Sequence, residues 1–388
     1  MIHEFLPRIV RQEFIVTMAC NMSCSYCFEH DENKCGQMPE ITAFRAVDFL
    51  VEQSRNSDRI ELTFIGGEPL LEFDLIKSTI RYARDHKVRK EKNKRIGFTI
   101  TTNGTLLEEE HVRFFHDNEC RYLLSLDGAS DTNDTYRKMR NGQNQYEIIR
   151  QKMPMLKSYQ PWQGARVTVL PQTARQLAKN IETLHRELKI NQFVIGFATG
   201  IHWAEEEIAD YCFALKEVFE FLLQERINNE NPRLRIALME VGLIDEAYAD
   251  NIITNWGCGA GSGRVSVAPD GTLYGCTKLA FAARGQERPL PLGNVFTGFT
   301  ETKNRLTLLN HTNEVRPKCK ECSFAKRCNG GCYAANLTDT GNIFTASDSY
   351  CKLIFAQMTA ADYARNRLRK LGLKNVIWHT GEQDAEIS

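Results

Sequence analysis

The 388-residue sequence has no excess of either charge, no long apolar run and no recognisable export signal. Lysine plus arginine and aspartate plus glutamate both number 49, so the net charge is zero. A non-specific nucleic-acid binder, which needs a basic surface, is therefore not expected. No apolar stretch approaches the ~18 residues that span a membrane. The first residues, Met-Ile-His-Glu-Phe, lack a basic region followed by an apolar one, so we expect a cytoplasmic rather than a secreted protein.

Cysteine, in contrast, is abundant. The chain holds 13 cysteines, an odd number, and seven of them lie between Cys258 and Cys351. Cytosolic thiols stay reduced, so cysteines that are this numerous and this clustered indicate metal ligation or catalysis rather than disulfides.

From about residue 13 to residue 200, short apolar segments alternate with stretches of helical apolar spacing. Six such units predict an α/β fold with a parallel sheet and helices packed outside it. An open doubly wound sheet and a complete or partial barrel both satisfy the pattern, and both place their chemistry at the carboxyl ends of the strands. The predicted strands are 13–18, 60–65, 96–102, 122–127, 166–170 and 192–197, and the predicted helices are 41–53, 71–84, 106–118, 146–157 and 174–188.

The composition changes beyond a further helix, which is predicted over residues 205–229. Residues 264–268 and 272–274 flank an Asp-Gly pair, a strong signal for a β-hairpin. A last helix is predicted over residues 354–371. We therefore expect a body of residues 1–230, a cysteine-rich module of residues 231–355, and a terminal helix and tail of residues 356–388.

Directly after the first predicted strand, three cysteines follow the spacing Cys20-x3-Cys24-x2-Cys27. A structural zinc site has four ligands, and an iron–sulfur cubane usually takes one thiolate for each iron. Three thiolates on a cubane leave one iron free to bind another molecule, as the open position of a catalytic metal does. Cys35, in a polar loop further along the chain, is a candidate fourth ligand.

This spacing, with Tyr26 before the third cysteine, resembles the signature of the radical S-adenosylmethionine (SAM) enzymes. The resemblance implies that the free iron chelates SAM, whose reductive cleavage gives a 5′-deoxyadenosyl radical that abstracts hydrogen from a substrate. It also implies a partial (β/α)6 barrel with the cysteine loop after its first strand. A flavodoxin or ferredoxin is the reductant expected for such an enzyme.

Segments at other predicted strand ends resemble the SAM-binding motifs of the same family. Gly66-Gly67-Glu68-Pro69 is similar to a Gly-Gly-Glu motif that engages the SAM amino group through backbone and carboxylate. By resemblance, Ser125 contacts the ribose or methionine end, and Arg137 pairs with the SAM carboxylate. The predicted SAM-binding residues are Tyr26, Gly66, Gly67, Glu68, Asn103, Ser125, Arg137 and, against the adenine, Ile195.

The downstream cysteines follow a second pattern. A four-thiolate zinc site is one interpretation, but seven ligands match neither one zinc nor two unshared zincs. The pattern resembles the SPASM extension of radical SAM enzymes that modify peptides and proteins. This implies a C-terminal cysteine-rich SPASM module with two auxiliary [4Fe-4S] clusters, and three clusters in all. By resemblance, the outer cluster is held by Cys319, Cys322, Cys328 and Cys351, and the inner one by Cys258, Cys276 and Cys332, with Gly271 also matching.

Two departures from the anaerobic sulfatase maturases of this family bear on the reaction. Those enzymes have an eighth module cysteine, which residues 259–264 lack here, so the inner cluster is expected to have an open iron or a non-cysteine ligand. They also carry an aspartate, their proposed base, at the position of Thr277. A neutral threonine cannot accept a proton as a carboxylate does. The catalytic candidates are therefore Thr277, Lys278 and Cys35, a thiol suited to returning a hydrogen atom.

Four other residues have a simpler expectation. Cys120 and Cys212 are predicted core residues. His202 and Trp203, just past the sixth strand, have two interpretations: a structural role, or a place along a substrate channel.

The leading prediction is a maturase that forms a thioether or another cross-link in a ribosomally made precursor peptide, or that epimerises it. The first strand starts near residue 13, so no N-terminal recognition domain is expected, and a separate recognition protein or the barrel mouth would bind the peptide. Oxidation of Ser or Cys to formylglycine is the first alternative. The second is a non-catalytic zinc or iron–sulfur scaffold, which leaves the Gly66-Gly67-Glu68 match unexplained.

Overall fold

The computed structural model describes residues 6–28, 36–86, 94–228, 234–238, 259–282, 290–310, 316–328 and 330–372. Within them, one sheet has the strand order β10-β9-β8-β1-β2-β3-β4-β5-β6-β7. The strands are β1 (Arg11–Thr17), β2 (Arg59–Gly66), β3 (Arg95–Thr102), β4 (Cys120–Ser125), β5 (Gly164–Val169), β6 (Gln192–Phe197), β7 (Arg235–Leu238), β8 (Arg264–Val267), β9 (Thr272–Tyr274) and β10 (Gly293–Asn294).

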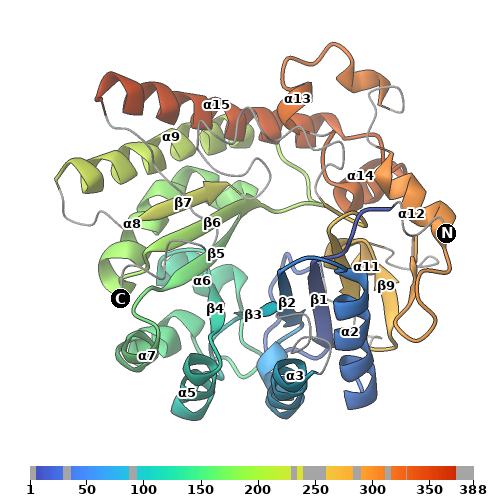
Figure 1. Cartoon of the computed structure of the whole chain (residues 1–388). Helices are drawn as coiled ribbons and strands as arrows, with labels where there is room; N and C mark the ends of the chain where they lie inside the picture. Colours follow the sequence, from blue (N-terminus) through green and yellow to red (C-terminus); the bar gives the residue numbers. More distant parts are fainter. Residues whose placement is uncertain are drawn as a thin grey trace.

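All neighbours from β8 through β1 to β7 pair in parallel, and the curved sheet is covered by helices on its outer side (Figure 1). Alternate residues of β2, namely Ile60, Leu62 and Phe64, are buried in the core that the sheet forms with these helices. Phe14 of β1 meets Phe64 there, with ring centroids 5.7 Å apart. In β2 this period-two burial leaves the partly exposed Glu61, Thr63 and Ile65 on the other face, toward the barrel interior.

The helices that alternate with the strands keep the predicted order. They are α2 (Glu40–Gln53), α3 (Phe73–Asp85), α5 (Glu109–Asp117), α6 (Ser130–Tyr136), α7 (Gln145–Tyr159), α8 (Leu177–Leu188) and α9 (Glu205–Ile227), with 3-10 turns η1 (Pro69–Glu72) and η2 (Pro171–Gln176). Each 3-10 turn begins with a proline, whose fixed φ suits the first position of a helical turn. Each takes the place of the predicted first turn of the helix that follows it.

The α/β partial barrel predicted from the sequence is confirmed, and so is the hairpin of β8 and β9. The short strand β7 and helix α6 were not predicted. The predicted boundary near residue 230 falls between strands of one sheet, because β7 pairs with β6 and β8 pairs with β1. The domain limits themselves stay predictions.

The C-terminal region adds α11 (Thr277–Phe281), α12 (Thr302–Leu309), the turn η4 (Pro317–Cys319), α13 (Ala325–Cys328), α14 (Tyr333–Thr340) and α15 (Asp348–Lys370). The last helix starts at Asp348, one turn and a half before the predicted Ile354, because the Ser347 hydroxyl caps it by accepting from the Tyr350 N–H at 3.2 Å.

Helix α15 lies along α9, which joins the end of the chain to the barrel (Figure 1). Glu220 of α9 accepts from the Tyr363 hydroxyl at 2.6 Å and from Arg367 Nε at 2.8 Å. Cys120 is buried in the core, as predicted, and Cys212 packs against the core partly buried. None of the helices in the described ranges combines the length and the apolar character of a transmembrane segment.

Candidate active site

The first cysteine loop lies beyond the carboxyl end of β1, over residues 18–28. Its backbone is tied to the segment after β4, because the Ser25 N–H donates to the Tyr136 carbonyl at 3.0 Å. The loop therefore sits at the edge of the sheet where the parallel strands end. It holds three of the predicted iron ligands, all partly buried: Cys20, Cys24 and Cys27.

The thiols of this loop influence one another. Burial is the main cause that raises the pKa of Cys20 to about 12; negative charge on Glu68, Cys24 and Cys27 acts in the same direction, and a hydrogen bond from the Met22 N–H opposes it. Burial likewise raises the pKa of Cys24, against the favourable charge of Arg137. Thiolates are the form that ligates metal, and a cation among them would offset this electrostatic cost. The donor set therefore fits an iron–sulfur cluster.

Gly66 and Gly67 let the end of β2 lie directly against this loop. A Cβ built on Gly66 would lie 2.3 Å from the Thr17 carbonyl oxygen, and one on Gly67 would lie 2.2 Å from that of Ala19. Gly66 also has a φ of +143°, which side-chain-bearing residues rarely adopt. The Gly67 N–H donates to the Thr17 carbonyl at 3.0 Å, so the two strand ends are joined by their backbones.

Glu68, next in the chain, is fully buried and held by three donors. Its carboxylate accepts from the Thr102 hydroxyl at 2.7 Å, the Asn103 N–H at 2.8 Å and the Leu70 N–H at 3.1 Å. Burial raises its pKa to about 6, although these hydrogen bonds act in the opposite direction. An ammonium group brought to this carboxylate would favour its ionised form.

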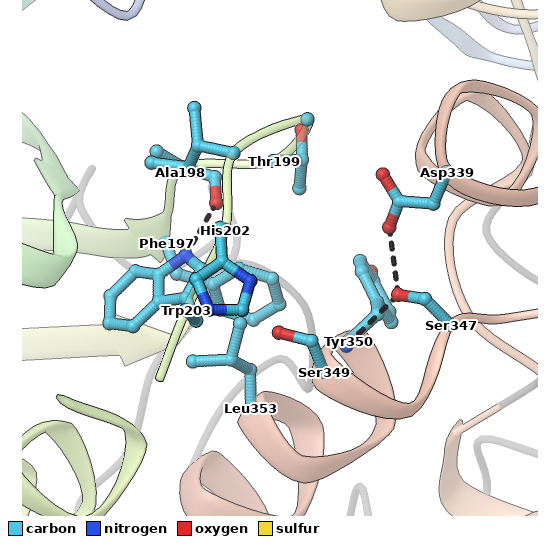
Figure 2. A pocket seen from close by; sticks show the side chains of 12 residues that line it. Phe197, Ala198, Thr199, His202, Trp203, Asp339, Ser347, Ser349, Tyr350 and Leu353 are labelled. Atoms are coloured by element: carbon cyan, nitrogen blue, oxygen red, sulfur yellow. Dashed lines mark hydrogen bonds between the residues drawn. The ribbon is translucent and has the colours of Figure 1, made fainter. Parts of the chain in front are cut away.

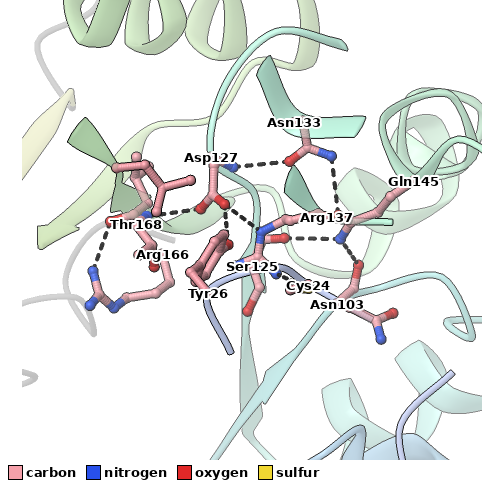
Figure 3. Close-up of polar contacts among 12 residues, drawn as sticks. Cys24, Tyr26, Asn103, Ser125, Asp127, Asn133, Arg137, Gln145, Arg166 and Thr168 are labelled. Atoms are coloured by element: carbon pink, nitrogen blue, oxygen red, sulfur yellow. Dashed lines mark hydrogen bonds and ion pairs between the residues drawn. The ribbon is translucent and has the colours of Figure 1, made fainter. Parts of the chain in front are cut away.

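Asp127, at the carboxyl end of β4, joins the cysteine loop to two strands (Figure 3). One carboxylate oxygen accepts from Arg137 Nε at 2.8 Å and from the Tyr26 hydroxyl, and the other accepts from the Thr168 N–H at 2.8 Å. Arg137 Nη1 also lies 3.9 Å from Cys24 Sγ. Arg137 and Asp127 form an ion pair that is almost completely buried.

The remaining predicted SAM-binding residues lie around the same edge. Asn103 donates through Nδ2 to Asn21 Oδ1 at 2.8 Å, which links the end of β3 to the cysteine loop. Gln145 of α7 donates to the carbonyls of Asn103 and Ser125 at 2.6 and 2.9 Å. Ile195 is buried in β6. The structure thus gathers the predicted residues other than Ile195, which packs in the core, and their contacts with SAM stay predictions.

Sequence reasoning missed two members of this network. Asp127, two residues after the predicted contact residue Ser125, had no assigned role, and Asn21 was only a residue between cysteines. The signal that could have found Asp127 is a carboxylate just past a strand end and ten residues before Arg137, which follows α6.

Four of the downstream cysteines surround one cavity of about 470 Å³, which is also lined by Tyr350, Phe344 and Phe355. The pKa of Cys351 is raised to about 11, mainly by burial and also by its cysteine neighbours, while the charge of Lys318 lowers it. Among the described residues, no three Cys, His, Asp or Glu side chains converge as the ligands of a single ion do. The cavity-lining cysteines are Cys319, Cys322, Cys328 and Cys351, the four assigned to an outer cluster.

The structure places two of the other predicted cluster ligands at helix starts. Cys276 is the N-cap of α11 and Cys332 is the N-cap of α14, and these two helices touch. Both thiols are partly buried against the core. Cys258 and Cys35 lie outside the described residues.

Thr277, the first catalytic candidate, is buried and held by a glutamate from the barrel wall. Its N–H and its hydroxyl both donate to Glu13 Oε2, at 2.8 and 2.5 Å. Glu13 Oε1 lies 3.5 Å from Arg264 Nη1, and the Ser266 hydroxyl lies 3.2 Å from that of Thr277. Strand β1 therefore supplies a carboxylate at Thr277, the residue that follows Cys276. Lys278 is half-buried next to it.

The chain matches the Radical SAM superfamily over residues 14–212, which is half of its length and includes the cysteine loop and all strands through β6. The protein belongs to that superfamily and is a radical SAM enzyme. It is 24% identical over 328 residues to the cysteine-type anaerobic sulfatase-maturating enzyme of Clostridium perfringens, covering 81% of this chain and 85% of that one.

Solved structures share the fold over nearly the whole chain. That of anSMEcpe with bound AdoMet (SAM) has a TM-score of 0.76 at 21% identity, covering 95% of this chain and 96% of the other. Streptococcus suis SuiB bound to S-adenosylmethionine has a TM-score of 0.63 at 17% identity, covering 90% and 78%. The radical SAM fold predicted from the cysteine motif is confirmed.

Proposed function

We propose that this enzyme is a SPASM-type maturase that abstracts hydrogen from a residue of a ribosomally made peptide, forming a thioether or another cross-link or inverting a stereocentre. The solved structures that share its fold include SuiB bound to its precursor peptide SuiA and anSMEcpe bound to the Cp18Cys peptide. Peptide binding by proteins of this fold supports the same class of substrate here.

The observation that carries this proposal is the cavity of Cys319, Cys322, Cys328 and Cys351. A second set of thiols, separate from the cysteine loop, is what a SPASM module with auxiliary clusters requires. A four-cysteine site on a non-catalytic scaffold would not need the buried Glu68 and Asp127 networks at the barrel mouth.

Each residue at the mouth has a defined task in this proposal. Cys20, Cys24 and Cys27 would hold the cluster to which SAM binds, and SAM on a reduced cluster supplies the chemistry that removes a hydrogen atom from the substrate. Glu68 would accept from the SAM amino group. Asp127 fixes Arg137 by accepting from its Nε, and the other guanidinium nitrogens of Arg137 would bind the SAM carboxylate.

Formylglycine formation is the second candidate. The similarity to a sulfatase-maturating enzyme over 81% of the chain favours it, and so does the Glu13 carboxylate beside Thr277. Oxidation of a cysteine or serine releases a proton, and a carboxylate at hydrogen-bond distance from Thr277 is a group able to receive it.

The test begins with anaerobic reconstitution and a count of iron and sulfide, for which about twelve irons are expected from three cubanes. SAM and dithionite are then added, with flavodoxin or ferredoxin as a physiological alternative, and 5′-deoxyadenosine is quantified. A Cys-containing peptide encoded beside this gene is the substrate to assay. Mass spectrometry then distinguishes a cross-link from an aldehyde, which hydrazine reagents trap. A count of four irons together with turnover would reject the auxiliary clusters. The absence of 5′-deoxyadenosine would reject the radical reaction.

A separate recognition protein is expected to bring the peptide, and the cell interior is the expected site of action. A pull-down with the peptide as bait, with and without the proteins encoded nearby, tests the first expectation.

A further inference from the structure

A second cavity, of about 310 Å³, opens where β6 ends (Figure 2). One wall is the segment from β6 to α9, and the other is the end of α14 with the start of α15. His202 and Trp203 both line this cavity. The principal lining side chains are Phe197, Thr199, His202, Trp203, Asp339, Ser349 and Tyr350.

The inner wall of this cavity is aromatic and fixed. Phe197 and Tyr350 meet edge to face with centroids 5.2 Å apart, and Phe197 and Trp203 do so at 6.5 Å. Trp203 Nε1 donates to the Ala198 carbonyl at 3.1 Å, which closes the loop after β6 on itself. These rings are almost wholly buried, so the wall is pre-formed and presents only a small part of their surface to an apolar chain.

The opposite side carries polar groups with unused hydrogen-bonding capacity. The Ser349 hydroxyl is buried and has no partner among the described residues. Asp339 accepts from the Ser347 hydroxyl at 2.8 Å through Oδ2, so that Oδ1 is open toward the cavity mouth. Buried polar atoms are usually paired, and the Ser349 hydroxyl, which has almost no accessible surface, would reach a ligand in the cavity by a change of side-chain rotamer.

The charge of the cavity wall is negative. Asp339 is the carboxylate among its lining residues. The lysines nearby in the chain are already engaged, since Lys352 pairs with Glu205 and Lys318 pairs with Asp348. A cation that entered the cavity would thus meet an uncompensated carboxylate.

We propose that this cavity binds a lysine or arginine side chain of the peptide substrate. The methylene stem would lie on the aromatic wall, and the cationic head would reach Asp339 Oδ1 while donating to the Ser349 hydroxyl. The volume lies at the small end of ligand pockets and suits one side chain rather than a peptide segment. The inference rests on the proposed function, because it names the residue type that the peptide carries.

The position of the cavity suits this role. β6 ends at the same edge of the sheet as β4, whose end holds Asp127, with only β5 between them. A side chain held at β6 would therefore anchor the peptide beside the barrel mouth without occupying it.

The test uses the full, iron-loaded enzyme and two probes, acetyl-Gly-Lys-Gly-amide and its norleucine counterpart, which keeps the stem and removes the charge. Ligand-observed NMR and calorimetry compare their affinities in the wild type, Asp339→Asn and Ser349→Ala. Asp58→Asn removes an exposed carboxylate before β2, at the opposite edge of the sheet, and is the matched control. Unfolding temperatures verify that all variants are folded.

The lysine probe should bind the wild type more tightly than the norleucine probe. Asp339→Asn should weaken the lysine probe about three- to fivefold, as loss of one solvent-accessible ion pair does, and leave norleucine unchanged. Ser349→Ala should have a smaller effect and Asp58→Asn none. Equal affinities for the two probes, or equal effects of Asp339→Asn and Asp58→Asn, would overturn the inference. 5′-Deoxyadenosine formation in the same preparations reports separately on the proposed function, so either conclusion can fail alone.

Discussion

The barrel mouth and the four-cysteine cavity hold their predicted ligands in different ways. At the mouth, groups from several parallel strands meet, and Asp127 alone joins β4, β5 and the loop after β1. In the cavity, the thiols come from the turn η4, the segment that follows it, the four-residue helix α13 and the start of α15. The mouth is organised by the sheet. The cavity has little regular structure of its own to organise it.

We therefore expect the order of the two sites to depend on bound metal to different degrees. Short elements that bury few apolar side chains gain much of their order from bound metal, whereas a network built on parallel strands is ordered beforehand. The predictions below test that contrast.

The largest effect is expected from removing one cysteine at each site. Cys24→Ala should abolish 5′-deoxyadenosine formation and leave the unfolding temperature nearly unchanged. Cys322→Ala should keep nucleoside formation, lose about four irons and lose hydrogen-exchange protection over residues 316–351. Chromatography, iron analysis and exchange mass spectrometry measure these outcomes. Equal loss of protection at both sites would break the contrast.

Asp127→Asn should destabilise the fold by about 3 kcal/mol or more, because it leaves Arg137 buried without its counter-charge. The variant should also lose SAM binding. Denaturant unfolding measures the first effect and equilibrium dialysis the second. Glu206→Gln, at an exposed position of α9, is the control and should change neither.

SAM affinity should rise about tenfold between pH 5 and pH 7, since the pKa of Glu68 is about 6 and only its ionised form can form an ion pair with an ammonium group. In the free enzyme, the contribution of Glu68 to the stability of the fold has the opposite pH dependence. A raised carboxyl pKa favours the protonated folded state, so the contribution of Glu68 to stability is largest below its unfolded pKa and declines as the pH rises through 6. Glu68→Gln should flatten the pH dependence of SAM affinity. An unchanged slope in that variant would assign the pH dependence to another group.

The smallest effect concerns the contact that holds α15, and with it Cys351, on the barrel. Hydrogen bonds from Arg367 and Tyr363 hold the pKa of Glu220 below its usual value, so their stabilisation is present above the unfolded pKa and is lost as the pH falls through the lower, folded one. Glu220→Gln should cost about 0.5 kcal/mol at pH 7, because the pair is partly exposed. Thermal unfolding should show a larger difference from the wild type at pH 7 than at pH 3.

Much of the barrel could be predicted, because a parallel sheet leaves a strong local pattern. The alternation of Ile60, Leu62 and Phe64 marks β2 without any long-range information. The cysteine spacing and the strand-end motifs then located the mouth, since parallel strands bring their carboxyl ends to one edge.

Partners from distant segments could not be predicted. Nothing near Thr277 indicates Glu13, because that contact exists only once β8 pairs with β1. The cavity at β6 likewise depends on α15, which begins at a serine cap that periodicity does not detect.

The pairing of β8 with β1, Arg11 opposite Arg264, also sets an order of events during synthesis. The ribosome releases β1 first, with a side edge that has no partner until the chain has passed β8. An exposed strand edge is a site for pairing with another chain. Nascent or truncated forms that end before residue 264 should therefore be the ones that aggregate and require chaperones, while a chain that includes β8 pairs this edge of β1.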